Sequence, residues 1–214
     1  MAHQLIHRGL AKKSLAENTI KAFKYCFKKK YGIETDIHCT QDGKIVCFHD
    51  FNLKRKFKIN KILKNSKYKD LLKISKSKKN PIPLLNDLIK ISKNKRFLML
   101  EIKPLFSKES LKVLLRETKK LKNYSITSFK EKNIINLYKM KRNLNLGLII
   151  PSTFAVDKIV KKSNAKHIKF LVVEKKFLKE KKINKIKKKI YFYTIRDKKI
   201  FNRFSNQNLI FENL

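Results

Sequence analysis

The chain has 214 residues, 42% of them hydrophobic, which suits one domain with a sizeable core or two small ones. Lys and Arg number 55 against 16 Asp and Glu, a formal net charge of +39, which attracts anionic substrates and polyanions. Because the lysines are spread along the whole chain among many Asn and Ile residues, we attribute the excess to the codon bias of an AT-rich genome and expect no specific nucleic-acid partner.

The cysteines and the apolar runs exclude several other classes of protein. Cys26, Cys39 and Cys47 are odd in number and lack metal-binding spacing, so we expect reduced core cysteines and neither a disulfide framework nor a zinc site. No apolar run reaches about 18 residues, and no signal-peptide pattern precedes Gln4. We therefore expect a cytoplasmic protein without a transmembrane segment.

The first elements are a short strand and a helix. Leu5-Ile6 reads as a buried strand that ends in the polar residues 7–9. After residues 17–19, apolar side chains recur at helical spacing from Ile20 to Phe27, and Gly32 ends that helix.

Residues 32–50 combine two strands, a turn and several polar side chains. Glu34, Asp36 and His38 stand two apart and so project from one face of a strand. Asp42-Gly43 predicts the turn to a second strand, which ends at residues 49–50 in His-Asp. Two carboxylates on one face favour a metal site; the alternative is a solvated hairpin whose polar residues face water.

The next segment is basic and irregular from residue 51 to residue 80, with one short helix near 68–74. A helical stripe over 84–92 leads to a nearly continuous apolar strand over 97–103, which is typical of a strand buried on both faces. Glu101 and Lys103 share one face at its end, where they could also simply form a salt bridge.

Helices and strands then alternate to the end of the sequence. The expected helices cover 108–121, 132–140, 155–162, 179–188 and 199–204, and the expected strands 124–129, 146–150, 170–173, 190–195 and 209–211. About eight strands separated by helices predict parallel pairing in a closed (β/α)8 barrel of the TIM type, formed by a single domain over 1–214. The active site of such a barrel lies at the carboxyl ends of the strands, where the polar motifs fall.

Taken in order, these motifs resemble a known family. They are His-Arg-Gly at 7–9, Glu-Asn-Thr at 17–19, Gly-x-Glu-x-Asp at 32–36, Thr-x-Asp-Gly at 40–43, His-Asp at 49–50 and Glu-Ile-Lys at 101–103. The chain thus resembles the glycerophosphodiester phosphodiesterases, which are barrel-shaped enzymes, over essentially its whole length.

The resemblance implies a role for each motif residue. It implies one divalent cation, Mg²⁺ or Ca²⁺, bound by three carboxylates, an acid/base pair of histidines, and four side chains that contact phosphate or substrate. The metal ligands would be Glu34, Asp36 and Glu101, the histidines His7 and His49, and the substrate contacts Arg8, Lys103, Asn18 and Tyr193. Asn18 could instead serve only as a helix cap.

The implied reaction is hydrolysis of a glycerophosphodiester to sn-glycerol 3-phosphate and an alcohol, as in the recycling of phospholipid head groups. A cation and fixed positive charges would stabilise the charge that develops on the phosphate. The attacking group is either the 2-hydroxyl of the substrate glycerol or water, and either histidine could be the acid or the base.

Some positions depart from the family pattern. Ala16 replaces a proline, Tyr193 a tryptophan, and the tail reads Phe-Glu-Asn-Leu over 211–214 where Thr-Asp-x-Pro is expected. The cap insertion over 51–80 is short, and the last helix is missing or truncated, so a partner subunit could cover the bare flank in a homodimer. Two alternatives stay open: cleavage of lysophospholipids with transient membrane contact, and a retired barrel that binds polyanions.

Overall fold

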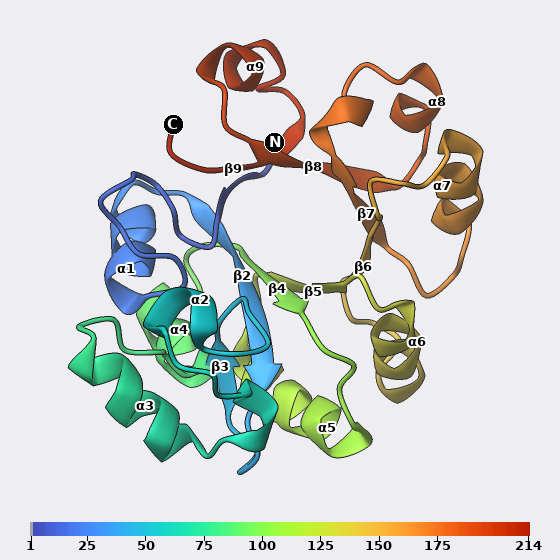
Figure 1. The fold of residues 1–214 in the computed structure, drawn as a ribbon. Coiled ribbons are helices and arrows are strands. Elements are labelled where there is room, and N and C mark those ends of the chain that lie inside the picture. The colour runs from blue at the N-terminus through green and yellow to red at the C-terminus, as the bar shows by residue number, and fades with distance from the viewer. Residues whose placement is uncertain (1) are drawn as a thin grey trace.

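A closed barrel of eight parallel strands forms the centre of the computed structural model, which describes residues 2–214 (Figure 1). The order around the barrel is β1-β9-β8-β7-β6-β5-β4-β2, and a β1–β2 pairing closes it. Its strands are β1 (Gln4–His7), β2 (Gly32–Cys39), β4 (Leu98–Ile102), β5 (Tyr124–Ser128), β6 (Leu146–Ile149), β7 (Phe170–Glu174), β8 (Lys189–Ile195) and β9 (Asn208–Phe211). The predicted (β/α)8 barrel is confirmed.

The strand register brings the motif residues side by side. His7 on β1 lies opposite Glu34 on β2, and Asp36 on β2 lies opposite Glu101 on β4. Because parallel strands end on the same side of a barrel, these four side chains meet at its carboxyl end.

The predicted turn over Asp42-Gly43 is present. Strand β3 (Ile45–Cys47) folds back antiparallel on β2, outside the barrel, with Ile37 opposite Cys47. Gly43 has a φ of 72°, the left-handed conformation that glycine adopts without steric cost. The hairpin delivers His49 to the mouth of the barrel.

Helices surround the barrel between successive strands (Figure 1). They are α1 (Ile20–Lys28), α4 (Leu85–Ser92), α5 (Lys108–Glu117), α6 (Glu131–Met140), α7 (Val156–Ser163), α8 (Lys181–Asn184) and α9 (Lys198–Arg203). The Thr19 side chain caps α1, and Ser107 and Asp197 cap α5 and α9 in the same way.

The apolar core has one part between strands and helices and a second part inside the barrel. The interior part comprises Leu5, Met99, Ile149, Phe170, Val172, Tyr191 and Ile210. Phe170 fills the space over Gly147, where an added Cβ would lie 2.2 Å from its ring. This packed interior forms a floor beneath the mouth.

The cap segment after β3 is more ordered than its sequence indicates. It contains α2 (Lys54–Phe57), a 3₁₀ helix (Leu63–Asn65) and α3 (Tyr68–Ser77). A third apolar cluster holds it together: Val46, Phe48, Leu53, Phe57, Leu63, Leu71 and Ile82. The cap therefore has a small core of its own against the hairpin.

The helix predicted over 179–188 is wrong in extent. Only Lys181–Asn184 is α-helical, with a 3₁₀ turn (Lys175–Phe177) before it. Lysines spaced three and four apart repel one another along a helix, and Ile183 is the one buried side chain of α8.

Three other expectations concern the ends of the fold, its cysteines and membranes. Among residues 2–214 no helix follows β9. All three cysteines are unpaired, and Cys26 and Cys47 are buried. None of the helices in this range is long and apolar enough to span a bilayer.

Candidate active site

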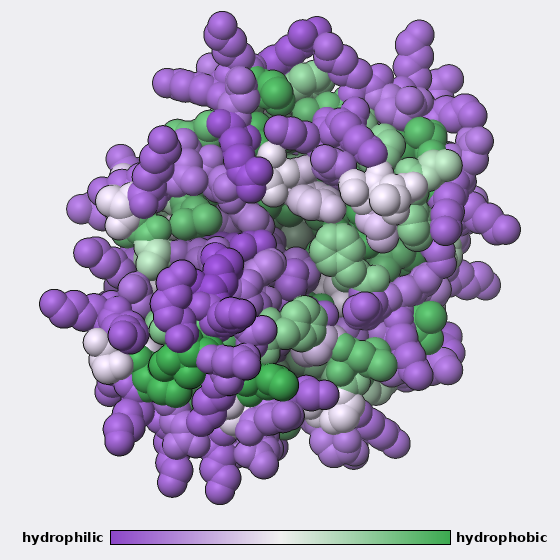
Figure 2. All heavy atoms as spheres, in the orientation of Figure 1, coloured by the Kyte–Doolittle hydropathy of each residue, from purple (hydrophilic) through white to green (hydrophobic). Residues whose placement is uncertain are grey.

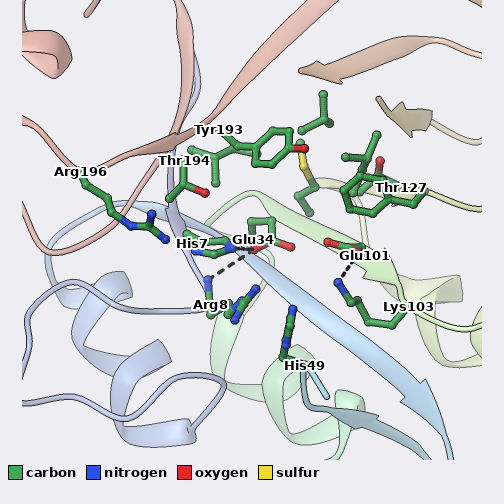
Figure 3. A pocket seen from close by; sticks show the side chains of 15 residues that line it. His7, Arg8, Glu34, His49, Glu101, Lys103, Thr127, Tyr193, Thr194 and Arg196 are labelled. Carbon is green, nitrogen blue, oxygen red and sulfur yellow. Dashed lines mark hydrogen bonds and ion pairs between the residues drawn. The ribbon is translucent and has the colours of Figure 1, made fainter. Parts of the chain in front are cut away.

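A cavity of about 270 Å³ opens at the carboxyl end of the barrel. Its lining comes from every barrel strand or the loop that follows it: His7, Arg8, Glu34, His49, Met99, Glu101, Lys103, Thr127, Phe129, Ile149, Val172, Tyr193, Thr194, Arg196 and Ile210. Figure 3 shows the charged members converging from opposite sides, and Figure 2 shows the hollow at the centre of this face. Seven of the nine side chains predicted for the site line this cavity.

Three buried carboxylates lie together at one side of the cavity. Glu34, Asp36 and Glu101 each offer an oxygen within 4.8 Å of the others, and none is more than 6% exposed. Glu34 Oε1 and Asp36 Oδ1 are buried and accept no hydrogen bond. Such oxygens are the ligands that hard divalent cations prefer, so the donor set fits Mg²⁺ or Ca²⁺.

The electrostatics of this acidic cluster also favour a cation. Burial, together with the charges of Asp36 and Glu101, raises the pKa of Glu34. Burial and the charge of Asp36 raise the pKa of Glu101 to about 7. The pKa of Asp36 is lowered even though burial opposes this, because Arg8 and Lys103 stabilise its charge. Two cations thus balance Asp36, Lys103 alone pairs with Glu101, and neither Arg8 nor Lys103 forms an ion pair with Glu34.

Arg8 and Lys103 lie on either side of Asp36. Arg8 Nε is 3.1 Å from Asp36 Oδ2, and Lys103 Nζ is 3.5 Å from Asp36 Oδ1 and 2.7 Å from Glu101 Oε1. The backbone of Arg8 is left-handed, with φ 51°, and its N–H donates to the carbonyl of Glu34 at 2.8 Å. The turn after β1 therefore directs this guanidinium toward the carboxylates (Figure 3).

His7 is paired with a carboxylate that directly follows the last strand. His7 Nδ1 lies 2.5 Å from Glu212 Oε2, and Arg196 Nε donates to Glu212 Oε1 at 2.5 Å. Burial opposes ionisation of Glu212, but the hydrogen bonds from His7 and Arg196 lower its pKa to about 2. The carboxylate fixes Nδ1 and leaves Nε2 of the ring on the side of Glu34, at 3.9 Å.

His49 has the same arrangement with its own neighbour. His49 Nδ1 lies 2.6 Å from Asp50 Oδ1, and Asp50 Oδ2 accepts from Arg55 Nε at 2.6 Å. Burial is the largest cause of the lowered pKa of His49, which favours the neutral ring at pH 7. The backbone of His49 is held by His38, whose Nε2 lies 3.1 Å from the His49 carbonyl. His38 is itself buried, and burial lowers its pKa to about 4.

Glu17 connects the cap to Arg8. Its Oε2 accepts from Arg8 Nη1 at 3.0 Å, and its Oε1 pairs with Arg55 Nη2. Lys56 Nζ also donates to the Glu17 carbonyl at 2.6 Å. Glu17 precedes α1, so the first loop of the barrel and the cap helix meet at this carboxylate.

The two other residues predicted to contact substrate, Tyr193 and Asn18, differ in whether they line the cavity. Tyr193 lines the cavity, and its ring stands edge-on to Phe129 with the centroids 6.5 Å apart. Asn18 does not line it: its side-chain amide donates to Asp36 Oδ2 at 3.0 Å and accepts from Thr35 Oγ1 at 2.7 Å. Asn18 thus orients Asp36 from behind the cavity, and Thr19 provides the cap of α1.

Comparison with known proteins identifies the family. A model of the Glycerophosphoryl diester phosphodiesterase family matches residues 7–199. The chain belongs to this family. A search of curated proteins finds no match.

Solved structures share the fold of this family member. A glycerophosphodiester phosphodiesterase from Thermotoga maritima matches with 22% identity and a TM-score of 0.84, covering 100% of this chain and 95% of the other. An Oleispira antarctica phosphodiesterase in complex with the product sn-glycerol-3-phosphate matches with 18% identity and a TM-score of 0.82. This match covers 100% of this chain and 93% of the other. A glycerophosphodiester phosphodiesterase from Parabacteroides distasonis matches with 18% identity and a TM-score of 0.80, and this match also covers 100% of this chain and 93% of the other. The family makes the chain an enzyme that hydrolyses phosphodiesters.

Sequence reasoning missed four charged residues of this phosphodiesterase site. They are Glu17, Arg55, Arg196 and Glu212. Glu212 directly follows the last strand, and an acidic residue at a strand end is the signal that could have indicated it. Arg55 stands in a run of lysines and arginine over 54–56, which gives no such signal.

Proposed function

We propose that the chain hydrolyses glycerophosphodiesters to sn-glycerol 3-phosphate and an alcohol, with one divalent cation held by Glu34, Asp36 and Glu101. The observation that carries this proposal is the joint presence, around one cavity, of three buried carboxylates, two cations and two histidines that are each paired to a carboxylate. The bound cation would supply Lewis-acid stabilisation of the negative charge on the phosphate oxygens.

Arg8 and Lys103 would bind the phosphodiester. Both are already oriented by carboxylates and reach the cavity with side chains less than one-fifth exposed. During attack, negative charge develops on the equatorial oxygens of the phosphate. Such preoriented cations stabilise this developing charge more than they stabilise the charge of the ground state. Family membership and the product named for the Oleispira antarctica structure support this substrate class.

His7 and His49 would transfer the protons. In each ring a carboxylate occupies Nδ1, so Nε2 is the nitrogen able to exchange a proton with substrate. One histidine would take the proton of the attacking hydroxyl, and the other would protonate the leaving alkoxide. The attacking group would be the glycerol 2-hydroxyl, giving a cyclic phosphate that water then opens; a rapid-quench experiment that finds no cyclic intermediate would favour direct attack by water.

The test is release of glycerol 3-phosphate from glycerophosphocholine and glycerophosphoethanolamine in Mg²⁺, Ca²⁺ or EDTA. We expect metal-dependent release that His49→Ala abolishes. Turnover that is unchanged in EDTA would contradict the metal role. Absence of both turnover and metal binding, with tight and salt-sensitive binding of nucleic acid, would favour the retired polyanion-binding barrel.

A second candidate activity is cleavage of lysophospholipids at a membrane surface. It is favoured by large apolar side chains exposed on the loops that surround the mouth: Phe51 is 55% exposed, Leu105 50% and Phe129 38%. Figure 2 shows apolar atoms gathered near the central hollow within a hydrophilic surround. Faster cleavage of lysophosphatidylcholine in vesicles than of glycerophosphocholine would support this activity. Leu105→Ser should then slow the cleavage of lysophosphatidylcholine.

The setting of this activity remains proposed. We infer a single domain that acts in the cytoplasm in lipid and glycerol metabolism. The predicted homodimer would cover an apolar groove between α1 and α9, lined in part by Ile6, Tyr25, Tyr31, Phe201 and Phe211. A monomeric mass in light scattering would refute it.

A further inference from the structure

One side chain of the cap connects two residues of the cavity, Arg8 and His49, without lining the cavity itself. Arg55, on α2, donates from Nε to Asp50 Oδ2 at 2.6 Å and from Nη2 to Glu17 Oε1. Its side chain is 55% exposed, whereas those of Asp50 and Glu17 are 17% and 13% exposed. It is not among the residues that line the cavity, and both of its partners are carboxylates.

Each of the two carboxylates leads to a different part of the site. Asp50 binds His49 Nδ1 at 2.6 Å through the oxygen that Arg55 does not contact. Glu17 binds Arg8 Nη1 at 3.0 Å, again through its other oxygen. Both carboxylates therefore serve as bridges, and a single guanidinium joins them.

The chemistry of the bridge requires arginine. A guanidinium presents several donors in one rigid plane and can bind two carboxylates at once, whereas an ammonium on a flexible stem offers a single point of charge. Of the positive side chains of α2, Arg55 alone contacts two carboxylates within residues 2–214.

The helix that carries Arg55 is itself fixed. Phe57 is 2% exposed and its ring stacks on Phe48, with the centroids 6.0 Å apart. Lys56 Nζ donates to the Glu17 carbonyl at 2.6 Å, a second link between α2 and the loop before α1. The position of Arg55 is thus set by the packing of the cap as well as by its two ion pairs.

We propose that Arg55 is a positioning residue that orients His49 through Asp50 and Arg8 through Glu17. This inference rests on the proposed roles of His49 in proton transfer and of Arg8 in phosphate binding. Through Asp50, Arg55 acts on the proton-transfer step and hence on kcat. Through Glu17, it acts on the binding of the phosphate by Arg8, and hence on KM as well as on kcat.

The first test compares Arg55→Ala with Lys54→Ala. Both remove one positive charge from α2, but the exposed Lys54 side chain makes no hydrogen bond or ion pair within residues 2–214. We expect Arg55→Ala to lower kcat/KM on the order of 10- to 100-fold, with kcat reduced and KM raised, and Lys54→Ala to stay within about twofold. Guanidinium ion should restore part of the activity of Arg55→Ala. Equal losses in the two variants, or no loss in Arg55→Ala, would overturn the proposal.

The two routes are separated by partial variants. Arg55→Lys should retain one ion pair at a time and recover only part of the loss. Asp50→Asn should lower kcat with little change in KM, whereas Glu17→Gln should also raise KM. Arg55→Ala should add little to the variant that combines both changes. If the effect of Arg55→Ala on kcat/KM were fully additive with the effects of Asp50→Asn and Glu17→Gln, Arg55 would not act through the two carboxylates.

A readout that needs no turnover separates this inference from the proposed function. The imidazole ¹⁵N shifts of His49 should change in Arg55→Ala, while those of His3 and His167, which bind Tyr191 and Glu131, should stay unchanged. If the wild-type chain cleaves no diester, the proposed function fails and these shifts still test the contact. Unchanged shifts of His49 would overturn the positioning role.

Discussion

Glu212 illustrates how a single residue outside the recognisable motifs can complete this site. It replaces the aspartate that the family pattern leads one to expect near the end of the chain, and it lies 2.5 Å from His7. Its longer side chain also reaches Arg196, so both oxygens have a partner. The departure in the tail therefore keeps a carboxylate on the histidine.

Glu212→Gln should slow the reaction with little effect on substrate binding. The amide preserves the shape of the side chain but cannot carry the negative charge that holds His7 Nδ1–H. We expect kcat to fall on the order of 10- to 100-fold, since partners that orient a histidine commonly contribute this much. Asp157→Asn, at an 82% exposed side chain of α7, is the matched control and should leave kcat unchanged.

The same carboxylate should contribute to the pH dependence of stability. Because the folded-state pKa of Glu212 is about 2, below its ordinary value near 4.5, the contribution is complete above pH 4.5 and is lost as the pH falls toward 2. Denaturant unfolding of the wild type and Glu212→Gln should show a stability difference that shrinks over this window. A difference that is constant from pH 6 to pH 2.5 would contradict the assignment.

At the scale of elements, Phe57 is the aromatic side chain through which α2 packs into the apolar cluster of the cap. Phe57 ends α2, packs into the apolar cluster of the cap and stacks on Phe48. Without it, a helix of four residues has little to hold it in place.

Phe57→Ala should therefore reduce both stability and activity. We expect a loss of about 3–5 kcal/mol in the free energy of unfolding, the usual cost of removing a buried phenylalanine ring. Amide hydrogen exchange should rise in residues 51–66 more than in the barrel strands. Uniform exchange across the chain would show that the cap and barrel unfold only together.

The elements and the central site residues were predictable, but the contacts between distant carboxylates and cations were not. His7 ends β1 and Glu101 lies one residue before the end of β4, and the barrel alternation places strand ends together. Asp36 lies inside β2, where its spacing of two from Glu34 indicates the shared face. Glu17 meets Arg55 only because the cap folds over the loop before α1. No periodicity in the sequence encodes that contact.

Helix boundaries are predicted well where apolar spacing is strong, and those of α9, which has no buried residue, also agree within one residue. The extent of α5 and α6 follows their buried stripes, with ends within a few residues of the prediction. The segment over 179–188 has good intrinsic helix formers but only Ile183 buried within α8, so lysine repulsion limits it to one turn.

At the scale of the whole molecule, the charge of +39 should affect substrate capture. A positive field raises the encounter rate of anionic ligands and is screened by salt, with a Debye length of about 10 Å at 0.1 M. We expect kcat/KM for glycerophosphoinositol, an anion, to fall as NaCl rises from 10 to 200 mM, while kcat changes little. Glycerophosphocholine, which carries no net charge, should show a much weaker dependence; equal slopes would mean that salt acts on the site and not on the field.

The closure of the barrel has a consequence for biosynthesis. Strand β1 lies between β2 and β9, and His7 at the end of β1 meets Glu212 just past β9. A ribosome that has translated only as far as residue 205 has made seven of the eight barrel strands, yet β1 still has one unpaired edge and His7 has no carboxylate. The proposed role of His7 in proton transfer thus implies that efficient cleavage begins only after residues 208–212 have left the ribosome.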